Sequence, residues 1–189
     1  VDVTGMNVGT SIADRIVLNS ANTDFVYSNI KTTGSDLLVV DDEGKLAERP
    51  LVGSGTEADP FVIASLADLE LFRAKVNGGN SFAGKFVKMT ADINLGNAEW
   101  TPIAKFNGTF DGDNHKISNL RVVGNGNVGF FKQVADQTEH VSGTVKNVTF
   151  ENATIISESG EGNAGLIALA PMGARITNVR LTGNVNIQG

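Results

Sequence analysis

The sequence predicts an all-β protein built as a coiled, repetitive stack of short strands with a short helix near its beginning. Three observations lead to this prediction. Gly and Asn are abundant, with 22 and 19 copies in 189 residues, while aromatic residues make up 6%. One stretch has helical spacing of apolar residues, and a strand-like motif recurs about every thirty residues. Such a composition favours short strands joined by tight turns.

Charge and composition exclude several classes of function. The net charge is −6 and the isoelectric point is about 4.9, with no strongly basic segment. Nucleic acids and anionic membranes are therefore not expected partners, because binding phosphate needs clustered Lys and Arg. No apolar run approaches the roughly 20 residues of a membrane span, so membrane insertion is not expected. Cysteine is absent, which excludes disulfides and thiolate metal sites.

The chain is expected to divide into a β-rich N-terminal segment or small module, residues 1–52, and a main domain, residues 53–189. In the first part, residues 15–18, 25–27 and 37–40 read as strands. The acidic run at residues 41–43 lacks the spacing and the closing Glu of a calcium loop, so it reads as a solvated turn. The ends of the sequence suggest a processed or excised piece with its leader removed.

The helix is predicted over residues 65–79, with its core at about 66–76. Ser65 and Asp68 resemble a capping box, and the pair Gly78-Gly79 ends the run. The apolar stripe consists of Leu66, Leu69, Phe72 and Val76. One amphipathic helix must cover an apolar surface, and an exposed end of the β-structure would suit it.

Short strands are expected after the helix, at residues 86–89, 93–95 and 100–103. The stretch Phe106–Val122 then reads as a strand, a tight polar turn and a second strand. Its turn contains Asp111, Gly112 and Asp113, residue types that tolerate positive φ or bond their own backbone. These residues are therefore expected to shape the chain.

Two motifs repeat after this turn. The pattern apolar, polar, Asn, apolar, polar, apolar begins at residues 117, 145 and 176, and so 28 and 31 residues apart. Its amides, Asn119, Asn147 and Asn178, are expected to lie at the same step of successive turns and to hydrogen-bond as a ladder. The second motif is Gly-rich, and its Gly129 and Gly165 lie 36 residues apart. Repeats of this period without intervening helices favour a β-helix, in which each turn stacks on its neighbours.

Residues 53–189 resemble bacterial surface proteins that carry GLUG repeats. The resemblance rests on GTEADPFVI, the short helix, ADINL, WTPI and FNGTFDGDNHKISNL. It is looser in the repeats, where Lys132 and Ala168 stand where the GLUG motif has Gly, and Ala104 replaces the Gly of W-x-P-I-G. The resemblance implies a right-handed parallel β-helix of the pectate-lyase-like kind. It also implies export to the bacterial surface and a role as an adhesin-like stalk or binding module.

Candidate catalytic residues are few. His115 and His140 lie 25 residues apart and neither begins an HExxH motif, so a zinc-peptidase centre is not expected. Carbohydrate cleavage needs paired carboxylates. Asp111 and Asp113 are two residues apart and Asp92 is a further candidate, but all three belong to turn or strand motifs of the resemblance.

The leading hypothesis is therefore a non-catalytic, exported surface protein that needs no cofactor and binds a glycan or a surface protein. A carbohydrate-active lyase or hydrolase is the alternative, and an accessory module of a larger peptidase or phage fibre is a third. Trp100 and Tyr27 are the weak candidates for ligand contact, although Trp100 fits the coil interior better. An open end of the coil would expose strand edges, so self-association is also predicted.

Overall fold

The computed structural model describes residues 38–40, 46–48, 50–159 and 162–189, and it divides the chain into two compact units, Val1–Pro50 and Leu51–Gly189. In the first unit, β1 (Leu38–Val40) pairs antiparallel with β2 (Leu46–Glu48). The strands expected at residues 15–18 and 25–27 and the acidic run at 41–43 lie outside the described residues, and so does Tyr27.

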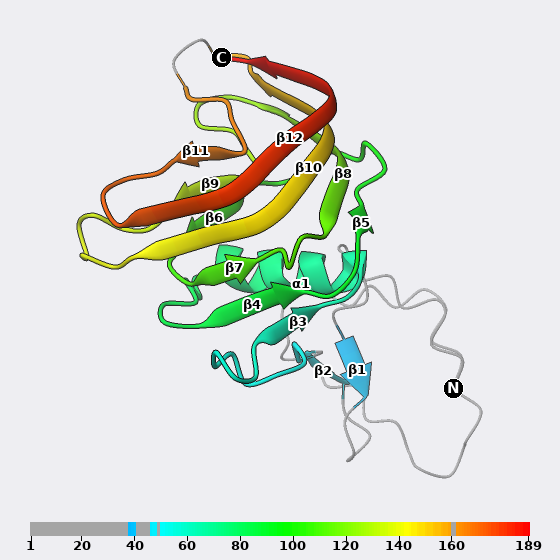
Figure 1. Ribbon diagram of the computed structural model, residues 1–189, viewed down its shortest axis with the longest axis vertical. Coiled ribbons are helices and arrows are strands. Elements are labelled where there is room, and N and C mark those ends of the chain that lie inside the picture. Colours follow the sequence, from blue (N-terminus) through cyan, green and yellow to red (C-terminus); the bar gives the residue numbers. More distant parts are fainter. Residues whose placement is uncertain (1–37, 41–45, 49, 160–161) are drawn as a thin grey trace. The chain divides into compact units, whose positions relative to one another are not determined.

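The second unit contains parallel β-sheets and the predicted helix (Figure 1). The first of its strands and the helix are β3 (Phe61–Ile63) and α1 (Leu66–Asn77). The next strands are β4 (Phe86–Met89), β5 (Ile93–Asn94), β6 (Ile103–Phe106), β7 (Thr109–Asp111), β8 (Lys116–Gly124) and β9 (Phe131–Val134). The last are β10 (Gly143–Ser157), β11 (Ile167–Leu169) and β12 (Ala174–Gln188).

The strands stack in layers, each formed by a segment that follows the previous one in sequence. The segments β4-β5-β6, β7-β8-β9, β10-β11 and β12 lie one above another in parallel register. One sheet contains β3, β4, β5, β7, β8, β10 and β12, and the other contains β6, β9 and β11. The long strand β10 pairs with both β7 and β8 beneath it. The β-rich, parallel fold expected from the repeats is thus present.

The core lies between the sheets and is rich in phenylalanine. Phe106, Phe110, Phe130 and Phe131 are fully buried and pack on one another with ring centroids 5.0–6.4 Å apart. Such aromatic pairs contribute about 0.5–1.5 kcal/mol each beyond their burial. Phe72 reaches this cluster from α1, with its ring 5.4 Å from that of Phe106.

The helix begins where the capping box predicts. The Ser65 hydroxyl accepts the Asp68 N–H at 3.2 Å and donates to the Asp68 carboxylate at 2.7 Å, and the backbone N–H of Ala64 also donates to that carboxylate. The buried residues of α1 are Leu69, Leu71, Phe72 and Val76. Leu66 was expected in the buried stripe, but it lies at the first helical position and is 39% exposed.

One end of the second unit is covered, and we call it the capped end. α1 contacts β3 and β6. On the outer side of β3, the Val62 N–H donates to the Val52 carbonyl at 2.8 Å. On the outer side of β6, the Asn77 side chain accepts the Ala104 N–H at 2.8 Å and donates to the Pro102 carbonyl at 3.1 Å. Asn77 therefore replaces a missing neighbouring strand.

Candidate interaction surface

The outward surface of the layers is held together by stacked side-chain amides. Asn178 donates to Asn147 at 3.1 Å, and Asn147 donates to Asp111 at 3.0 Å. A second ladder, about five residues further along the strands, runs from Asn152 to Asn119 at 3.4 Å and from Asn119 to Asn94 at 2.9 Å. Each rung joins two neighbouring layers.

The predicted single ladder is therefore wrong for Asn119. Ile117 pairs with Phe150 and not with Val145, so Asn119 lies beside Asn152. Val145 does pair with Ile176, which brings Asn147 and Asn178 together as expected. The partner beneath Asn147 is Asp111 of the polar turn.

The ladder residues also bend the chain. Asn119, Asn147, Asn152 and Asn178 have φ between 52° and 58°, the left-handed region that Asn tolerates better than most residues. At each such bend two successive side chains face outward, as at Lys146-Asn147 and Glu151-Asn152 of β10, and buried residues resume after them. The amide thus sets the corner and then bonds the corner of the next layer.

The carboxylates proposed as candidates for chemistry serve these corners. Asp111 accepts the backbone N–H of Asp113 at 3.0 Å and contacts the Lys146 ammonium at 3.1 Å. Burial raises the pKa of Asp111, but the hydrogen bonds from Asp113, Asn147 and Lys146 outweigh this and hold the pKa below its usual value. Asp113 has φ 48° and pairs with Lys88 at 3.0 Å, so it joins two layers as well.

Asp92 and His115 form another connection between layers. Asp92 accepts the Lys116 backbone N–H at 2.9 Å and lies 3.0 Å from His115 Nδ1. The pKa of Asp92 is lowered, first by the Lys116 N–H and then by the hydrogen bond with His115. Both contacts are made by Asp92 Oδ1, so this oxygen holds the turn of the next layer.

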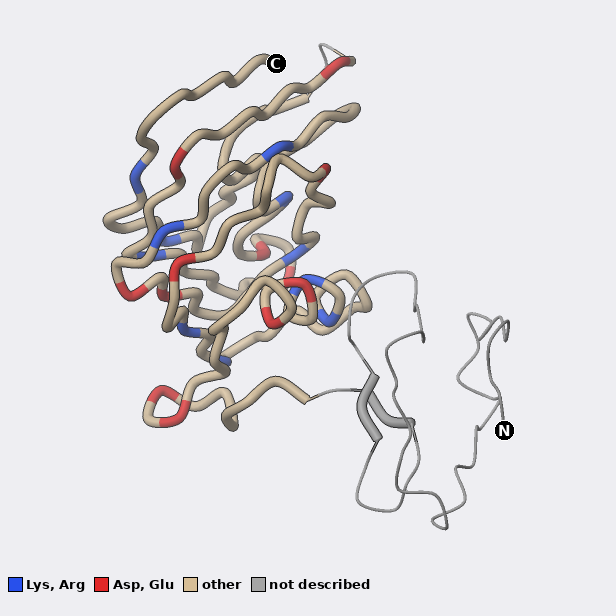
Figure 2. Tube along the Cα trace, turned by 90° about the vertical axis from the view of Figure 1, so that its right-hand side faces the viewer, with Lys and Arg blue, Asp and Glu red and all other residues tan. Residues whose placement is uncertain are grey.

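Further ion pairs follow the same arrangement. Lys116 pairs with Glu151 at 3.5 Å, and Arg121 pairs with Glu99 at 3.2 Å. Figure 2 shows residues of both signs interspersed over the second unit. Each exposed pair contributes about 0–1 kcal/mol, so their larger effect is to favour the correct register between layers.

Trp100 does not lie on the surface, which corrects its candidacy for ligand contact. It is 4% exposed, and its ring stacks on Phe130 with centroids 5.0 Å apart and planes at 3°. Its indole N–H donates to the Phe130 carbonyl at 3.2 Å. On the other side, the Arg73 guanidinium of α1 lies 4.2 Å from the ring centroid. Burial lowers the pKa of Arg73, against the opposing effect of Glu70. Trp100 therefore connects the helix to the sheets.

Sequence reasoning missed a loop that carries His140. Asp136 is 4% exposed and accepts the N–H groups of Thr138 at 2.9 Å and Glu139 at 3.2 Å. Lys105 contacts the other carboxylate oxygen, and this contact is the first cause of the lowered pKa of Asp136, followed by the Glu139 N–H. The available signal was Asp136 itself, because an Asp side chain can accept the backbone N–H two residues further on and so form a turn.

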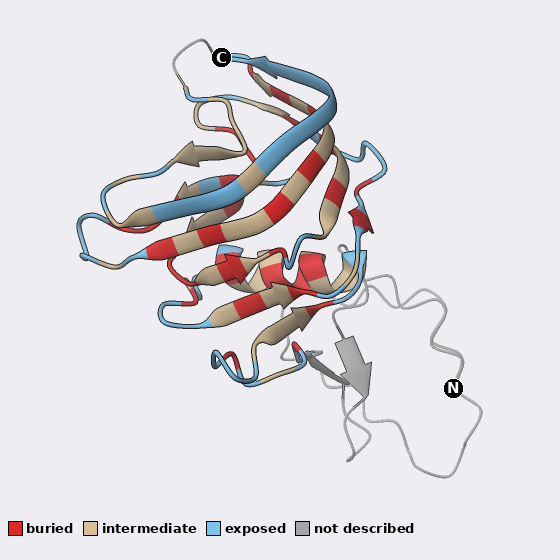
Figure 3. Ribbon diagram, viewed as in Figure 1, coloured by how far each residue is buried: buried red, intermediate tan, exposed pale blue. Residues whose placement is uncertain are grey.

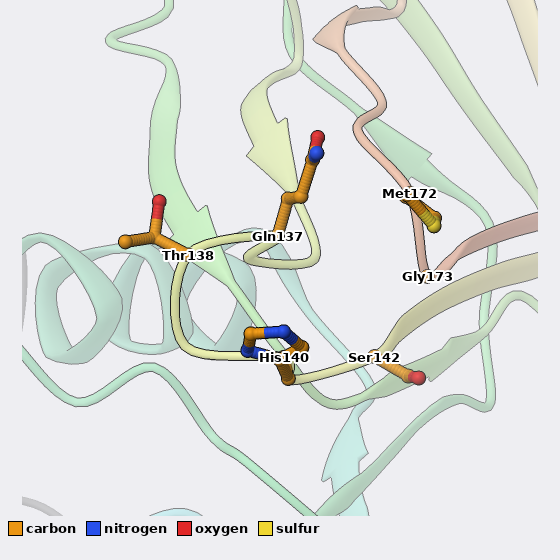
Figure 4. A pocket seen from close by; sticks show the side chains of 6 residues that line it. All are labelled: Gln137, Thr138, His140, Ser142, Met172 and Gly173. Carbon is orange, nitrogen blue, oxygen red and sulfur yellow. The ribbon is translucent and has the colours of Figure 1, made fainter.

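Beside this loop lies a pocket of about 590 Å³ (Figure 4). It is lined by Gln137, Thr138, His140, Ser142, Met172 and Gly173. Gln137 and Met172 approach it from different segments, 135–142 and 170–173. None of the six lining residues is acidic, so the pocket does not supply the paired carboxylates of a glycosidase. Among the described residues, no group of three or more His, Cys, Asp or Glu could hold a metal ion.

The Gly-rich repeats stack as the sequence predicts. Val128 and Ala164 form a parallel bridge, and Phe131 pairs with Ile167, so Gly129 lies beside Gly165. A Cβ atom at Gly129 would be 2.1 Å from the Gly165 carbonyl oxygen, whereas one at Gly165 would meet its nearest atom at 3.5 Å. Glycine is therefore required at position 129, whereas position 165 has room for a Cβ atom.

The last layer differs from those beneath it, and we call its surface the open end. It is formed by one edge of β12, which pairs with no strand among the described residues, and by the apolar side chains of that strand: Ile176, Val179, Leu181, Val185 and Ile187. These residues pair with Val145, Val148, Phe150, Ala153 and Ile155, all of which are 1% exposed or less. Figure 3 shows the contrast, with β12 exposed along most of its length and β10 alternating between buried and intermediate.

Comparison with known proteins identifies a similarity to part of a long protein. No family model and no solved structure matches the chain. No helix among the described residues is long and apolar enough to cross a membrane. Halomucin of Haloquadratum walsbyi (strain DSM 16790 / HBSQ001) is 30% identical over 162 residues, which is 76% of this chain and 2% of halomucin. The chain is thus similar to a small part of a very long protein.

Proposed function

We propose that this chain is a non-catalytic, adhesin-like module of an exported surface protein, in which a right-handed parallel β-helix of the GLUG type presents a polar surface or acts as a stalk. The observation that carries the proposal is that the outward carboxylates bond neighbouring layers to one another. Asp111, Asp113 and Asp92 each accept hydrogen bonds or ion pairs that join adjacent layers. The carboxylates that a catalytic site would need are thus engaged in contacts between layers.

Two further observations support this proposal. The parallel register between successive segments, with polar ladders outside and apolar residues inside, is the arrangement of a coil that can be extended by adding repeats. Similarity to 2% of halomucin is compatible with a place in a much longer surface protein. Because neighbouring repeats contact mainly each other, such a coil combines length with a uniform outer surface.

The ligand of the adhesin-like module would be a glycan or a surface protein recognised through hydroxyl and amide groups. The outward face of β10 and β12 offers Thr144, Thr149, Thr177 and Thr182 beside the amide ladders. Hydroxyl and amide groups can donate and accept, which suits a neutral polar ligand better than an anionic one.

The experiment is a glycan and mucin array combined with a screen for polysaccharide cleavage. The intact chain should be retained on one class of ligand without releasing product. Release of oligosaccharide by the wild type, and its loss in Asp111→Asn or Asp92→Asn, would show an enzyme and overturn the proposal. Antibody labelling of intact source cells should detect the chain at the surface, and labelling only after permeabilisation would contradict export.

A further inference from the structure

The corner between β9 and β10 carries a loop that stacking of the layers does not require. In the layer beneath, residues 107–108 are enough to connect β6 to β7. At the same corner of the next layer, residues 135–142 connect β9 to β10. The start of this loop stays in register with the shorter corner, because the Ala135 N–H donates to the Phe106 carbonyl at 2.9 Å, and β10 then pairs with β7. The further residues therefore project from the coil as an addition to its repeating path.

The backbone of this loop is both fixed and strained. The backbone groups of Asp136 and Val141 bond each other at 2.8 and 2.9 Å, and the buried Asp136 carboxylate accepts two N–H groups within the loop. Ala135 and His140 have φ of 73° and 57°, in the left-handed region that favours Gly, Asn and Asp. Among the described residues, only Phe82 besides these two combines a positive φ with another residue type. Strain that is held in place by surrounding bonds is typical of ligand sites.

The pocket beside the loop is formed by two neighbouring corners of the stack (Figure 4). One wall is the loop itself, and the other is the segment 170–173. The walls approach closely, since a Cβ atom added at Gly173 would lie 3.6 Å from the Cα and Oγ atoms of Ser142. Both walls precede β12 in the sequence, so the pocket is separate from the open end. Its volume of about 590 Å³ lies within the range of roughly 300–1,000 Å³ for small-molecule sites.

The polar side chains of the pocket are not used to hold the coil together. Within the described part of the chain, no hydrogen bond or ion pair engages the side-chain polar atoms of Gln137, Thr138, His140 and Ser142. The ladder amides and corner carboxylates, by contrast, bond neighbouring layers. Amide, hydroxyl and imidazole side chains can each donate and accept hydrogen bonds. A matching ligand carries groups that do both, which is the property of hydroxyl groups.

Charge and an apolar wall define the ligand further. Among the described residues, none of those lining the pocket is Lys, Arg, Asp or Glu. The loop carboxylate of Glu139 lies 3.8 Å from Lys105 and does not line the pocket. Met172 is 76% exposed and offers a flexible apolar surface to C–H groups. A neutral sugar combines both features, because its ring has hydroxyl groups at the rim and C–H groups on its faces.

We propose that the pocket binds one neutral sugar residue at the end or a branch of a glycan. The hydroxyl groups of the sugar bond the four polar side chains, and a C–H face of its ring packs against Met172. This inference rests on the proposed adhesin-like function, and it places a binding site of that function in the pocket instead of on the threonine-bearing face of β10 and β12.

The test uses the intact chain and simple methyl glycosides. Those of glucose, galactose and mannose are each compared with the matching uronic acid, in which a carboxylate replaces the hydroxymethyl group. Binding is detected by saturation-transfer difference NMR, and affinities are obtained by titration. We expect a neutral glycoside to bind more tightly than its uronic acid, because the pocket lining has no Lys or Arg to pair with the carboxylate.

Variants of the pocket locate the binding site. Gln137→Ala should weaken binding of the best glycoside by about 2- to 12-fold, the range for loss of one hydrogen bond. Met172→Ala should also weaken binding, and the double variant should weaken it further. The matched control Thr149→Ala/Thr177→Ala removes two outward hydroxyl groups from β10 and β12 and should leave the affinity unchanged. Gln137 and Met172 are exposed, so their variants should keep the fold, which circular dichroism checks.

Three results would overturn the inference: no saturation transfer to any neutral glycoside, unchanged affinity in the double pocket variant, or tighter binding of the uronic acid. The adhesin-like function would survive each of them if the glycan array still retained the chain without cleavage. Conversely, release of oligosaccharide by a chain whose pocket variants lose sugar binding would overturn the non-catalytic function and keep the site.

Discussion

The capped end and the open end of the second unit are made from the same kinds of strand. They differ in how far apolar side chains are buried and in how the outer strand edge is hydrogen-bonded. At the capped end, Leu71 and Phe72 of α1 are fully buried and Asn77 bonds the outer backbone of β6. At the open end, Leu181 occupies an equally inward column and is 39% exposed. Both ends therefore carry inward-facing apolar side chains, and side-chain polarity does not distinguish them. What differs is whether another element covers the last layer.

The largest expected effect comes from truncating the same residue type at each end. Leu71→Ala should lower the free energy of unfolding by about 2–5 kcal/mol, because it leaves a cavity under the helix. Leu181→Ala should cost about 1 kcal/mol, since part of that side chain already contacts water. Urea unfolding followed by the fluorescence of Trp100, the one Trp in the sequence, reports on the second unit. Equal losses would show that the open end is covered in solution.

A second pair of variants compares the stacked glycines. Gly129→Ala should destabilise the fold by about 1–3 kcal/mol, because the added Cβ would clash with the backbone of Gly165. Gly165→Ala, whose Cβ meets ordinary contact distances, should change stability by less than about 1 kcal/mol. Thermal unfolding of both variants measures the difference. The close approach of the two segments would be contradicted if the two substitutions were equally harmful.

The ladder offers a smaller effect that again depends on position. The Asn147 side chain makes hydrogen bonds at 3.0 and 3.1 Å, the shorter one to the Asp111 carboxylate, whereas the Asn178 side chain makes one at 3.1 Å and a longer one to Asn114 at 3.5 Å. Both residues have a left-handed backbone conformation, so replacement by Ala at either position carries a similar conformational cost of about 1 kcal/mol. Asn147→Ala should therefore cost about 1 kcal/mol more than Asn178→Ala. Gly variants at both positions remove the backbone cost and should keep the same difference; if it vanishes, the amide bonds do not stabilise the layers.

Acid should weaken the inner layers and leave the junction between β10 and β12 little affected. The folded pKa of Asp111 is lowered, so its contribution is present above the unfolded pKa of about 3.9 and is lost as the pH falls through the folded value. Between pH 5 and pH 2.5, the free energy of unfolding should fall less steeply with decreasing pH in Asp111→Asn than in the wild type. Arg180→Ala is the control and should keep the wild-type slope, because β12 has no acid. Identical slopes for wild type and Asp111→Asn would contradict this role.

Much of the local structure could be predicted from the sequence. Ser65 and Asp68 marked the start of α1, and the short strand predicted at residues 86–89 is β4. These signals are local, since a cap or a strand is set by residues a few positions apart. The pairing of Gly129 with Gly165 was also recoverable, because that motif occurs once in each layer.

The register between β8 and β10 could not be predicted in the same way. The Asn motif occurs twice on β10, from Val145 to Phe150 and again from Phe150 to Ile155. Either copy matches Ile117–Val122 in apolar pattern. The choice depends on β7, which occupies the first copy by pairing Phe110 with Val145. A contact between segments 35 residues apart therefore decides the register, and the burial of Trp100 depends in the same way on the distant Phe130 and Arg73.

The two bends of β10 give this strand its own periodicity of buried and outward side chains. Buried side chains recur at Val145, Val148, Phe150, Ala153 and Ile155, so the inside–outside pattern repeats every five residues. Deleting Lys146 alone would leave one outward position where the corner has two. Deleting a whole unit, residues 146–150, would leave the pattern intact and only shorten the strand. Viable length changes in this strand are thus restricted to multiples of five, much as coding insertions are restricted to multiples of three.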